Sequence, residues 1–247
     1  MRTILAFILI IGFLLVGYLL LAFFWIFGKF NPHVADICQL RIVQTIFKGI
    51  SFLAGAKVTY IGEENVPKDE AVLYVANHRS MLDIVITYAR CPGLTGYIAK
   101  DTIKKVPGLR AWMKRLHCEF LVRDDIKQGM KVILSAIDKI KRGISICIFP
   151  EGTRNRDKED LTSVLPFKDG SFKIAQKTGC KIVPIAITGT NRVFEDHFPW
   201  ARKGKVIIEY GTPITFAELA PEDQKHVGAY FQNEIQQMLY KHTELMK

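Results

Sequence analysis

Cysteine is scarce in this sequence, and no spacing typical of a metal site is present. The five cysteines lie far apart and include no C-x-x-C pair, which argues against a disulfide framework and a thiolate metal site. The six histidines form no H-E-x-x-H or comparable pattern. Internal repeats are absent as well. We therefore expect reduced thiols and a site without a metal ion.

A serine nucleophile of the usual kind is also missing, because the chain contains no G-x-S-x-G segment. Basic residues are in excess, with 34 Lys and Arg against 24 Asp and Glu and a formal net charge of +10. They form no stripe interleaved with stacking aromatics, which disfavours nucleic acid as a partner. This excess suits anionic partners, above all an anionic membrane surface.

Charged residues are absent from residues 4–27, which read ILAFILIIGFLLVGYLLLAFFWIF. A cleaved signal peptide has a shorter apolar region and a small-residue cleavage site, and Phe27-Gly28-Lys29-Phe30 offers no such site. A helix of this length would reach roughly 36 Å, enough to cross a bilayer core of about 30 Å. The alternative is a hairpin that enters one leaflet, because Asn31-Pro32 ends the first helix.

Apolar residues recur at helical spacing over residues 33–55. Such a face fits an ordinary core helix or a membrane surface, and the preceding apolar run favours the membrane. The first bases after that run are Lys29, Arg41, Lys48 and Lys57. The positive-inside rule then places the rest of the chain on the cytoplasmic side of the cell membrane. We predict a membrane-associated helical hairpin over residues 1–55 and a cytoplasmic-side domain over residues 56–247.

From residue 56 onward, short apolar strands alternate with helical stretches. The expected strands are 57–61, 71–76, 95–99, 119–122, 144–149, 182–187 and 205–210, and the expected helices are 80–90, 107–117, 127–142, 170–178 and 222–246. This alternation predicts an α/β domain whose central sheet is covered by helices on both faces. Two segments that mix Trp with bases, 110–115 and 198–203, suit the bilayer surface, with the core as the alternative, above all for Trp112, which lies on an expected helix.

The segment Asn77-His78-Arg79-Ser80-Met81-Leu82-Asp83 follows the expected strand 71–76. Ser80 is suited to cap the next helix, and Asp83 would then complete a capping box from the third helical position. The same geometry brings His78 close to the Asp83 carboxylate, which would fix the imidazole tautomer and leave Nε2 as a base. A His–Asp pair without its own nucleophile suits direct transfer to a hydroxyl on the substrate, with no covalent enzyme intermediate.

The segment Pro150-Glu151-Gly152-Thr153-Arg154 follows the expected strand 144–149. Gly152 allows a close backbone approach, Thr153 supplies a hydroxyl and Arg154 can bind a phosphate through two hydrogen bonds. A polar turn with a surface arginine is the alternative. Position at a strand end favours a functional loop, because sites in such sheets gather there.

Asn77-His78-x4-Asp83 followed by the hexapeptide FPEGTR (Phe149 to Arg154) resembles the glycerolipid acyltransferase family. FPEGTR is most similar to the 1-acylglycerol-3-phosphate O-acyltransferases, also called lysophosphatidate acyltransferases. The resemblance extends over residues 56–215. Family members carry a further block with a lysine before a Pro-Gly segment and an arginine at its end, and the matching residues here are Lys105, Pro107, Gly108 and Arg123. Val122 stands where many relatives have an acid, so this block departs from the family pattern next to Arg123.

The resemblance implies a mixed α/β sheet preceded by a two-helix membrane-anchoring segment. It also implies an enzyme that transfers a fatty acyl group from an acyl thioester to the 2-hydroxyl of lysophosphatidate and forms phosphatidate. His78 would be the general base and Asp83 the carboxylate that orients it. The substrate-binding residues would be Lys105, Arg123, Glu151, Gly152, Thr153 and Arg154, with Arg154 and Lys105 on the phosphate and Glu151 organising its loop or contacting the glycerol.

No cofactor is expected beyond the co-substrate, which would be acyl coenzyme A or acyl-acyl carrier protein. Two alternatives stay open. One is an acyltransferase that acts on another lysolipid or on glycerol-3-phosphate. The other is a non-catalytic protein that binds anionic lipid, although that role gives no reason for His78 and Asp83 at their spacing.

Overall fold

The computed structural model describes residues 1–122 and 125–246. Its strands are β1 (Ala56–Ile61), β2 (Leu73–Ala76), β3 (Thr95–Lys100), β4 (Glu119–Leu121), β5 (Ser145–Ile148), β6 (Lys181–Thr188), β7 (Gly204–Tyr210) and β8 (Ile214–Thr215). Its α-helices are α1 (Arg2–Phe27), α2 (Pro32–Ala54), α3 (Met81–Tyr88), α4 (Pro107–Arg115), α5 (Ile126–Lys141), α6 (Lys173–Thr178), α7 (Thr190–Val193), α8 (Pro221–Lys225) and α9 (Val227–Leu245). Short 3-10 helices are η1 (Glu63–Asn65), η2 (Asp101–Lys105), η3 (Asp169–Phe172), η4 (Glu195–His197) and η5 (Phe216–Glu218).

The strands form one mixed sheet in the order β1-β7-β6-β2-β5-β3-β4, and β8 pairs with β6. β6 is antiparallel to β7 and β8, whereas the other neighbouring strands are parallel. Each strand expected from the sequence is present. The two-residue β8 is not predicted, because it is too short to show a periodic pattern. The prediction of a mixed α/β sheet is confirmed.

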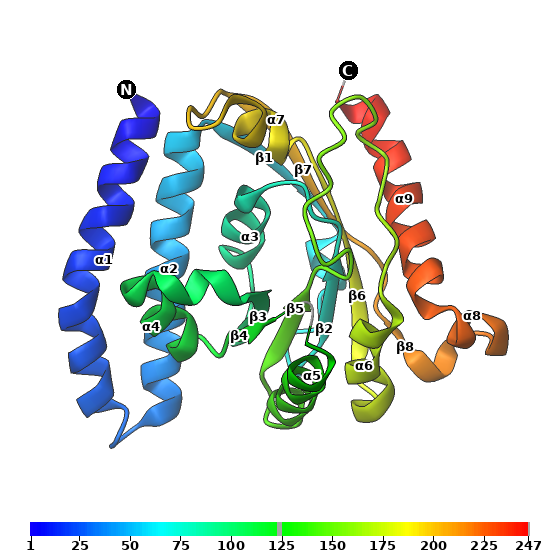
Figure 1. Cartoon of the computed structure of the whole chain (residues 1–247), viewed down its shortest axis with the longest axis horizontal. Coiled ribbons are helices and arrows are strands. Elements are labelled where there is room, and N and C mark those ends of the chain that lie inside the picture. The colour runs from blue at the N-terminus through cyan, green and yellow to red at the C-terminus, as the bar shows by residue number, and fades with distance from the viewer. Residues whose placement is uncertain (123–124, 247) are drawn as a thin grey trace.

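Helices cover both faces of this sheet because side chains alternate along each strand. In β2, Tyr74 and Ala76 pack with α2, α3 and α4 on one face. Leu73 and Val75 of the same strand pack with α5, α6 and α9 on the other face. Two cores therefore lie on either side of the sheet, and Figure 1 shows the two groups of helices to its left and right.

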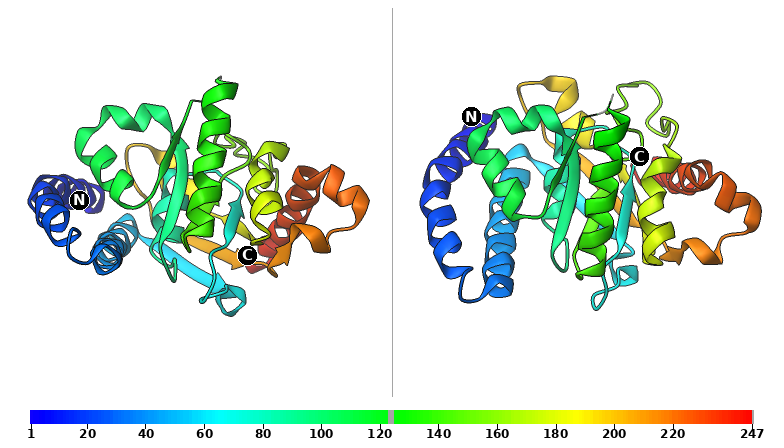
Figure 2. Two further views of the ribbon diagram at one scale, coloured as in Figure 1. Left: turned by 90° about the horizontal axis from the view of Figure 1, so that it is seen from below. Right: turned by 60° about the horizontal axis from the view of Figure 1, so that its bottom comes forward.

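The first two helices form the expected hairpin. Asn31 accepts a hydrogen bond from the Val34 N–H and Pro32 occupies the first position of α2, so the break between the helices is local in origin. Gly55 ends α2 in the left-handed conformation with φ of 83°. Both helices are long and apolar enough to cross a membrane, and they run side by side at one edge of the molecule (Figures 1 and 2).

The apolar face of α2 packs inside the protein and not on the outer surface. Leu40 and Val43 are 0% and 3% exposed and belong to the core between α2, α3 and the sheet. The core-helix interpretation of this face is therefore correct. Outward-facing apolar residues lie on α1 instead, for example Leu15 and Leu19 at 68% and 75% exposure. Exposed apolar surface of this extent marks a contact with lipid or protein.

The two Trp-containing segments differ in the exposure of their tryptophans. Trp112 is 2% exposed and packs against Phe13 of α1, with ring centroids 4.9 Å apart. The expectation of a bilayer contact is wrong for this residue, because α1 covers that side of α4. Trp200 is 56% exposed and Phe198 is 65% exposed, so the second segment does present aromatic surface.

Candidate active site

The two motif loops meet at one edge of the sheet. β2 and β5 are adjacent parallel strands, so the segments that follow their carboxyl ends lie next to each other. A backbone hydrogen bond of 2.7 Å from the Asn155 N–H to the His78 carbonyl oxygen joins them. The structure thus brings together two motifs that are far apart in the sequence.

His78 and Asp83 form the pair that their spacing predicts. The distance between His78 Nδ1 and Asp83 Oδ2 is 2.8 Å, and the imidazole stacks on Phe149 with ring centroids 4.2 Å apart. The His78 side chain is 14% exposed, and its Nε2 makes no hydrogen bond to any described residue. Because Nδ1–H donates to the carboxylate, Nε2 is left to accept a proton from a bound hydroxyl.

Asp83 is fully buried and accepts hydrogen bonds on both oxygens. Oδ2 also accepts from the backbone N–H groups of Arg79 and Ser80, each at 2.8 Å. Oδ1 accepts from the Thr190 hydroxyl at 2.5 Å. Ser80 caps α3 and the capping box is complete. The capping role and the contact with His78 are therefore served by one carboxylate, and neither excludes the other.

Glu151 organises its loop. It is 5% exposed, and its two oxygens accept hydrogen bonds from the backbone N–H of His78 at 2.5 Å and of Leu165 at 2.9 Å. Burial raises the pKa of Glu151 to about 7, against the opposing effect of these two donors. Gly152 has a φ of 69°, a left-handed conformation that explains glycine at this turn.

Arg154 projects toward the start of α3, where its Nη1 lies 2.8 Å from Glu195 Oε1. Thr153 is exposed and makes no hydrogen bond to the described part of the chain. Lys105 is exposed at the end of η2, and no hydrogen bond or ion pair among the described residues links it to His78 or Arg154. Arg123 lies outside the described residues. The shared phosphate contact expected for Arg154 and Lys105 stays a prediction.

Three residues of the site are not predicted from the sequence. Arg79 is 2% exposed, and its guanidinium donates to the carbonyl oxygens of Asp157, Asp160 and Ser163, which holds the loop after Arg154. The other two are Thr190 and Glu195, which both follow β6. In the sequence, only their position after a central strand could have indicated them, because a polar segment that follows the carboxyl end of such a strand lies at the same edge of the sheet as His78.

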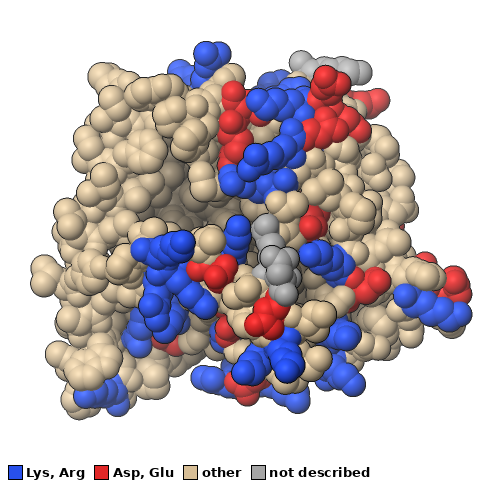
Figure 3. All heavy atoms as spheres, viewed as in Figure 1, with Lys and Arg blue, Asp and Glu red and all other residues tan. Residues whose placement is uncertain are grey.

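Two cavities border the start of α3. One, of about 480 Å³, is charged and includes Arg154, Arg156, Lys158 and Glu195 in its lining. The other, of about 400 Å³, is almost wholly apolar and lies between α1, α2, α3 and α4. Met81 lines both cavities. Figure 3 shows a hollow of uncharged surface on this face, bordered by Lys and Arg.

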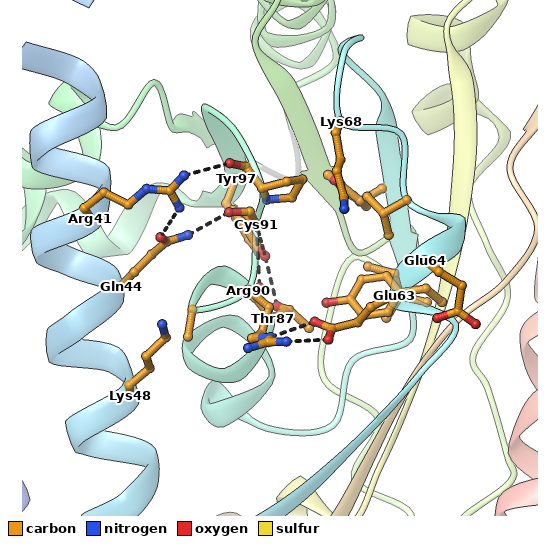
Figure 4. A pocket seen from close by; sticks show the side chains of 16 residues that line it. Arg41, Gln44, Lys48, Glu63, Glu64, Lys68, Thr87, Arg90, Cys91 and Tyr97 are labelled. Atoms are coloured by element: carbon orange, nitrogen blue, oxygen red, sulfur yellow. Dashed lines mark hydrogen bonds and ion pairs between the residues drawn. The ribbon is translucent and has the colours of Figure 1, made fainter. Parts of the chain in front are cut away.

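A third cavity, of about 480 Å³, lies near the other end of α3 (Figure 4). Gln44 of α2 donates to the carbonyl oxygens of Tyr88 and Cys91, and Arg41 donates to that of Pro92. These side chains bind the carbonyl oxygen of the last residue of α3 and two carbonyl oxygens of the segment that follows it. Arg41, one of the first bases after the apolar run, therefore has a structural contact as well.

Comparison with known proteins agrees with this geometry. A sequence model of the acyltransferase family matches residues 57–188. The chain belongs to the acyltransferase family. It is 30% identical over 187 residues to a 1-acyl-sn-glycerol-3-phosphate acyltransferase of Borreliella burgdorferi, covering 74% of this chain and 72% of that protein. It is 28% identical over 193 residues to the corresponding protein of Saccharomyces cerevisiae, covering 78% of this chain and 62% of the yeast protein.

A solved member of the family has the same arrangement over nearly its whole length. The crystal structure of the 1-acyl-sn-glycerophosphate acyltransferase PlsC from Thermotoga maritima superposes with a TM-score of 0.72 at 26% identity, covering 98% of both chains. The similarity therefore includes the N-terminal helices as well as the sheet. Within residues 1–122 and 125–246, no group of three or more His, Cys, Asp or Glu side chains is placed to hold a metal ion.

Replacing Asp83 separates orientation of His78 from helix capping. In Asp83→Asn the amide oxygen can keep the N–H donors at Oδ2, and the NH2 group can donate to Thr190 in place of Oδ1. We expect little change in melting temperature but a loss of activity of roughly 10²–10⁴, because the negative charge no longer stabilises the imidazolium. Both quantities are measured on one preparation. Asp125→Asn is the control, since Asp125 caps α5 away from the site. Full activity in Asp83→Asn would show that the carboxylate only caps α3.

The buried Glu151 carboxyl predicts a pH-dependent stability. Its pKa is raised on folding, so the folded state holds the proton more tightly and stability is lost as the pH rises from about 4.5 to about 7. Glu151→Gln does not titrate and removes this dependence. The free energy of unfolding of the wild type should therefore fall relative to the variant by about 2–3 kcal/mol across that range. Urea titrations at several pH values measure this difference in the free energy of unfolding. A difference that does not change with pH would show that folding does not raise the pKa of Glu151.

Proposed function

We propose that this protein transfers a fatty acyl group from an acyl thioester to the 2-hydroxyl of 1-acylglycerol-3-phosphate and forms phosphatidate. The observation that carries the proposal is the His78–Asp83 pair, because Met81, which lies between these two residues in the chain, lines both a charged and an apolar cavity. An acceptor with a phosphate head and an acyl tail needs a charged surface and an apolar surface, both close to the base that activates its hydroxyl. The names of the relatives point to the same acceptor.

The chemistry follows from the free Nε2 of His78. This nitrogen takes the proton of the glycerol hydroxyl as the hydroxyl oxygen attacks the thioester carbonyl carbon. Asp83 stabilises the imidazolium that forms. The carbon–sulfur bond then breaks, and the imidazolium returns its proton to the leaving thiolate. Ser80 is the nearest hydroxyl in sequence, but it caps α3 and bonds to Glu195, which supports direct transfer without an acyl-enzyme.

Binding of the acceptor would divide between the two cavities. Arg154 is suited to the phosphate, because a guanidinium binds phosphate oxygens through paired hydrogen bonds and the adjoining cavity carries further bases. The apolar cavity is suited to an acyl chain. The donor would be acyl coenzyme A or acyl-acyl carrier protein, each anionic and therefore compatible with the basic surface. No other cofactor is proposed.

The substrates also support a position at the membrane. The exposed apolar side of α1 and the aromatic pair Phe198 and Trp200 would contact lipid. The bases that follow α1 favour the cytoplasmic face of the cell membrane. A lysolipid could then reach His78 without leaving the bilayer surface.

A panel of acceptors tests the proposal. Purified full-length protein in mixed micelles receives an acyl thioester and lysophosphatidate, lysophosphatidylcholine or glycerol-3-phosphate, and mass spectrometry identifies the products. We expect phosphatidate as the main product. His78→Ala should lower its rate by roughly 10²–10⁴. Preferred use of another acceptor, or a folded and fully active His78→Ala, would disprove the proposal.

Arg154 provides a second test, directed at the phosphate. Arg154→Ala should raise the KM for lysophosphatidate about ten- to a hundredfold, because a charge-assisted hydrogen bond contributes roughly 1.5–3 kcal/mol. The KM for the acyl donor should change far less. Arg142→Ala is the control, since Arg142 pairs with Asp138 on the surface of α5. A rise in the KM for the donor instead would show that Arg154 binds a phosphate of the acyl donor and not that of lysophosphatidate.

A further inference from the structure

Glu195 of η4 accepts hydrogen bonds from three different donors near the start of α3. Its Oε1 accepts hydrogen bonds from the Met81 backbone N–H at 2.7 Å and from Arg154 Nη1 at 2.8 Å. Its Oε2 accepts a short hydrogen bond from the Ser80 hydroxyl. These donors are a helix N-terminus, an arginine and the helix-cap hydroxyl. Together they form the set of donors that phosphate oxygens use in proteins.

The surroundings of Glu195 also point to a bound anion. The charged cavity of about 480 Å³ beside it includes Arg154, Arg156 and Lys158 in its lining. Arg79 lines the same cavity, is 2% exposed, and its Nε has no hydrogen-bond partner among the described residues. The lining also includes the acids Asp157 and Asp196, and the Glu195 carboxylate, held by Arg154, is only 19% exposed.

The chemistry of the proposed reaction places the phosphate at this point. In 1-acylglycerol-3-phosphate, only a few covalent bonds separate the 2-hydroxyl from the phosphorus. A hydroxyl at Nε2 of His78 therefore requires its phosphate to lie close by. Ser80 and Met81, which bind the Glu195 carboxylate, follow His78 almost directly in the chain.

We propose that Glu195 is an internal substitute for the substrate phosphate. In the free enzyme it holds Arg154 and the first N–H of α3, and lysophosphatidate must displace it to bind. This inference rests on the proposed function. It makes Glu195 a residue that sets acceptor specificity. A doubly charged phosphate can replace the carboxylate, whereas an acceptor without a phosphate offers nothing to Arg154 in exchange.

Glu195→Gln tests the displacement. Glutamine keeps the size of the side chain, an oxygen for the Met81 N–H and a polar group for Ser80, but it holds Arg154 less strongly and does not repel phosphate. The KM for lysophosphatidate should fall on the order of tenfold, because the substrate then displaces a neutral hydrogen bond to Arg154 and not a charge-assisted one. The kcat should change little, because His78 and Asp83 are untouched.

Asp196→Asn is the matched control. Asp196 lines the same cavity and carries the same charge, but its recorded contact is to Asn191 Nδ2 at 3.0 Å and not to Arg154. It should show only the smaller through-space effect of a lost charge. Equal decreases in KM in both variants would indicate general electrostatics and overturn the proposal. An unchanged or higher KM in Glu195→Gln would also overturn it, since Glu195 would then position Arg154 for substrate.

Binding of inorganic phosphate separates this inference from the proposed function. The rise in melting temperature of the full-length protein with added phosphate is compared with that in chloride of equal ionic strength. A larger rise in Glu195→Gln than in the wild type or Asp196→Asn supports displacement, and equal rises overturn it. This measurement needs no turnover. If the variant gains phosphate affinity while lysophosphatidate is not acylated, the proposed function fails and the anion site stands.

Discussion

The buried Asp83 carboxylate is the interaction on which the site depends. It accepts hydrogen bonds from His78, from the two residues that precede α3 and from Thr190 beyond β6. The partial positive charge at the start of a helix stabilises such a carboxylate without solvent. Because the same oxygens start the helix and orient the imidazole, His78 cannot change its position unless the beginning of α3 changes too. The proposed base is thus preorganised by local secondary structure.

The helical hairpin supports α3 from its other end. Arg41 and Gln44 of α2 bind the carbonyl groups that follow the last turn of α3, and Leu40 and Val43 fill the core beneath it. α1 lies outside α2 and α4 and carries the exposed apolar surface. The helix proposed to contact the membrane, α1, is therefore connected through α2 to α3, the helix that holds Asp83. This packing would keep the site at a fixed place relative to the lipid surface.

Opposite kinds of surface meet at the start of α3. The charged cavity and the apolar cavity share Met81, so an amphiphile could place its head in one and its chain in the other. Glu151 links the second motif to the first through the His78 N–H. Its raised pKa is the result of burial in that position. The two motifs thus act as one unit although they belong to different strands.

Much of this arrangement is determined by the sequence itself. The strands and helices follow from short-range periodicity, and the His78–Asp83 contact depends on the geometry of a single helix start, which the residues between them encode. Other features depend on the order of strands in the sheet. Thr190 and Glu195 reach Asp83 and Arg154 only because β6 lies beside β2, and no spacing in the sequence specifies that neighbour. Periodicity likewise shows that one face of α2 is buried but cannot say what buries it. The tertiary structure decides that the sheet core covers α2 and leaves the outer side of α1 exposed, because burial depends on which elements pack together and not on the pattern of any one of them.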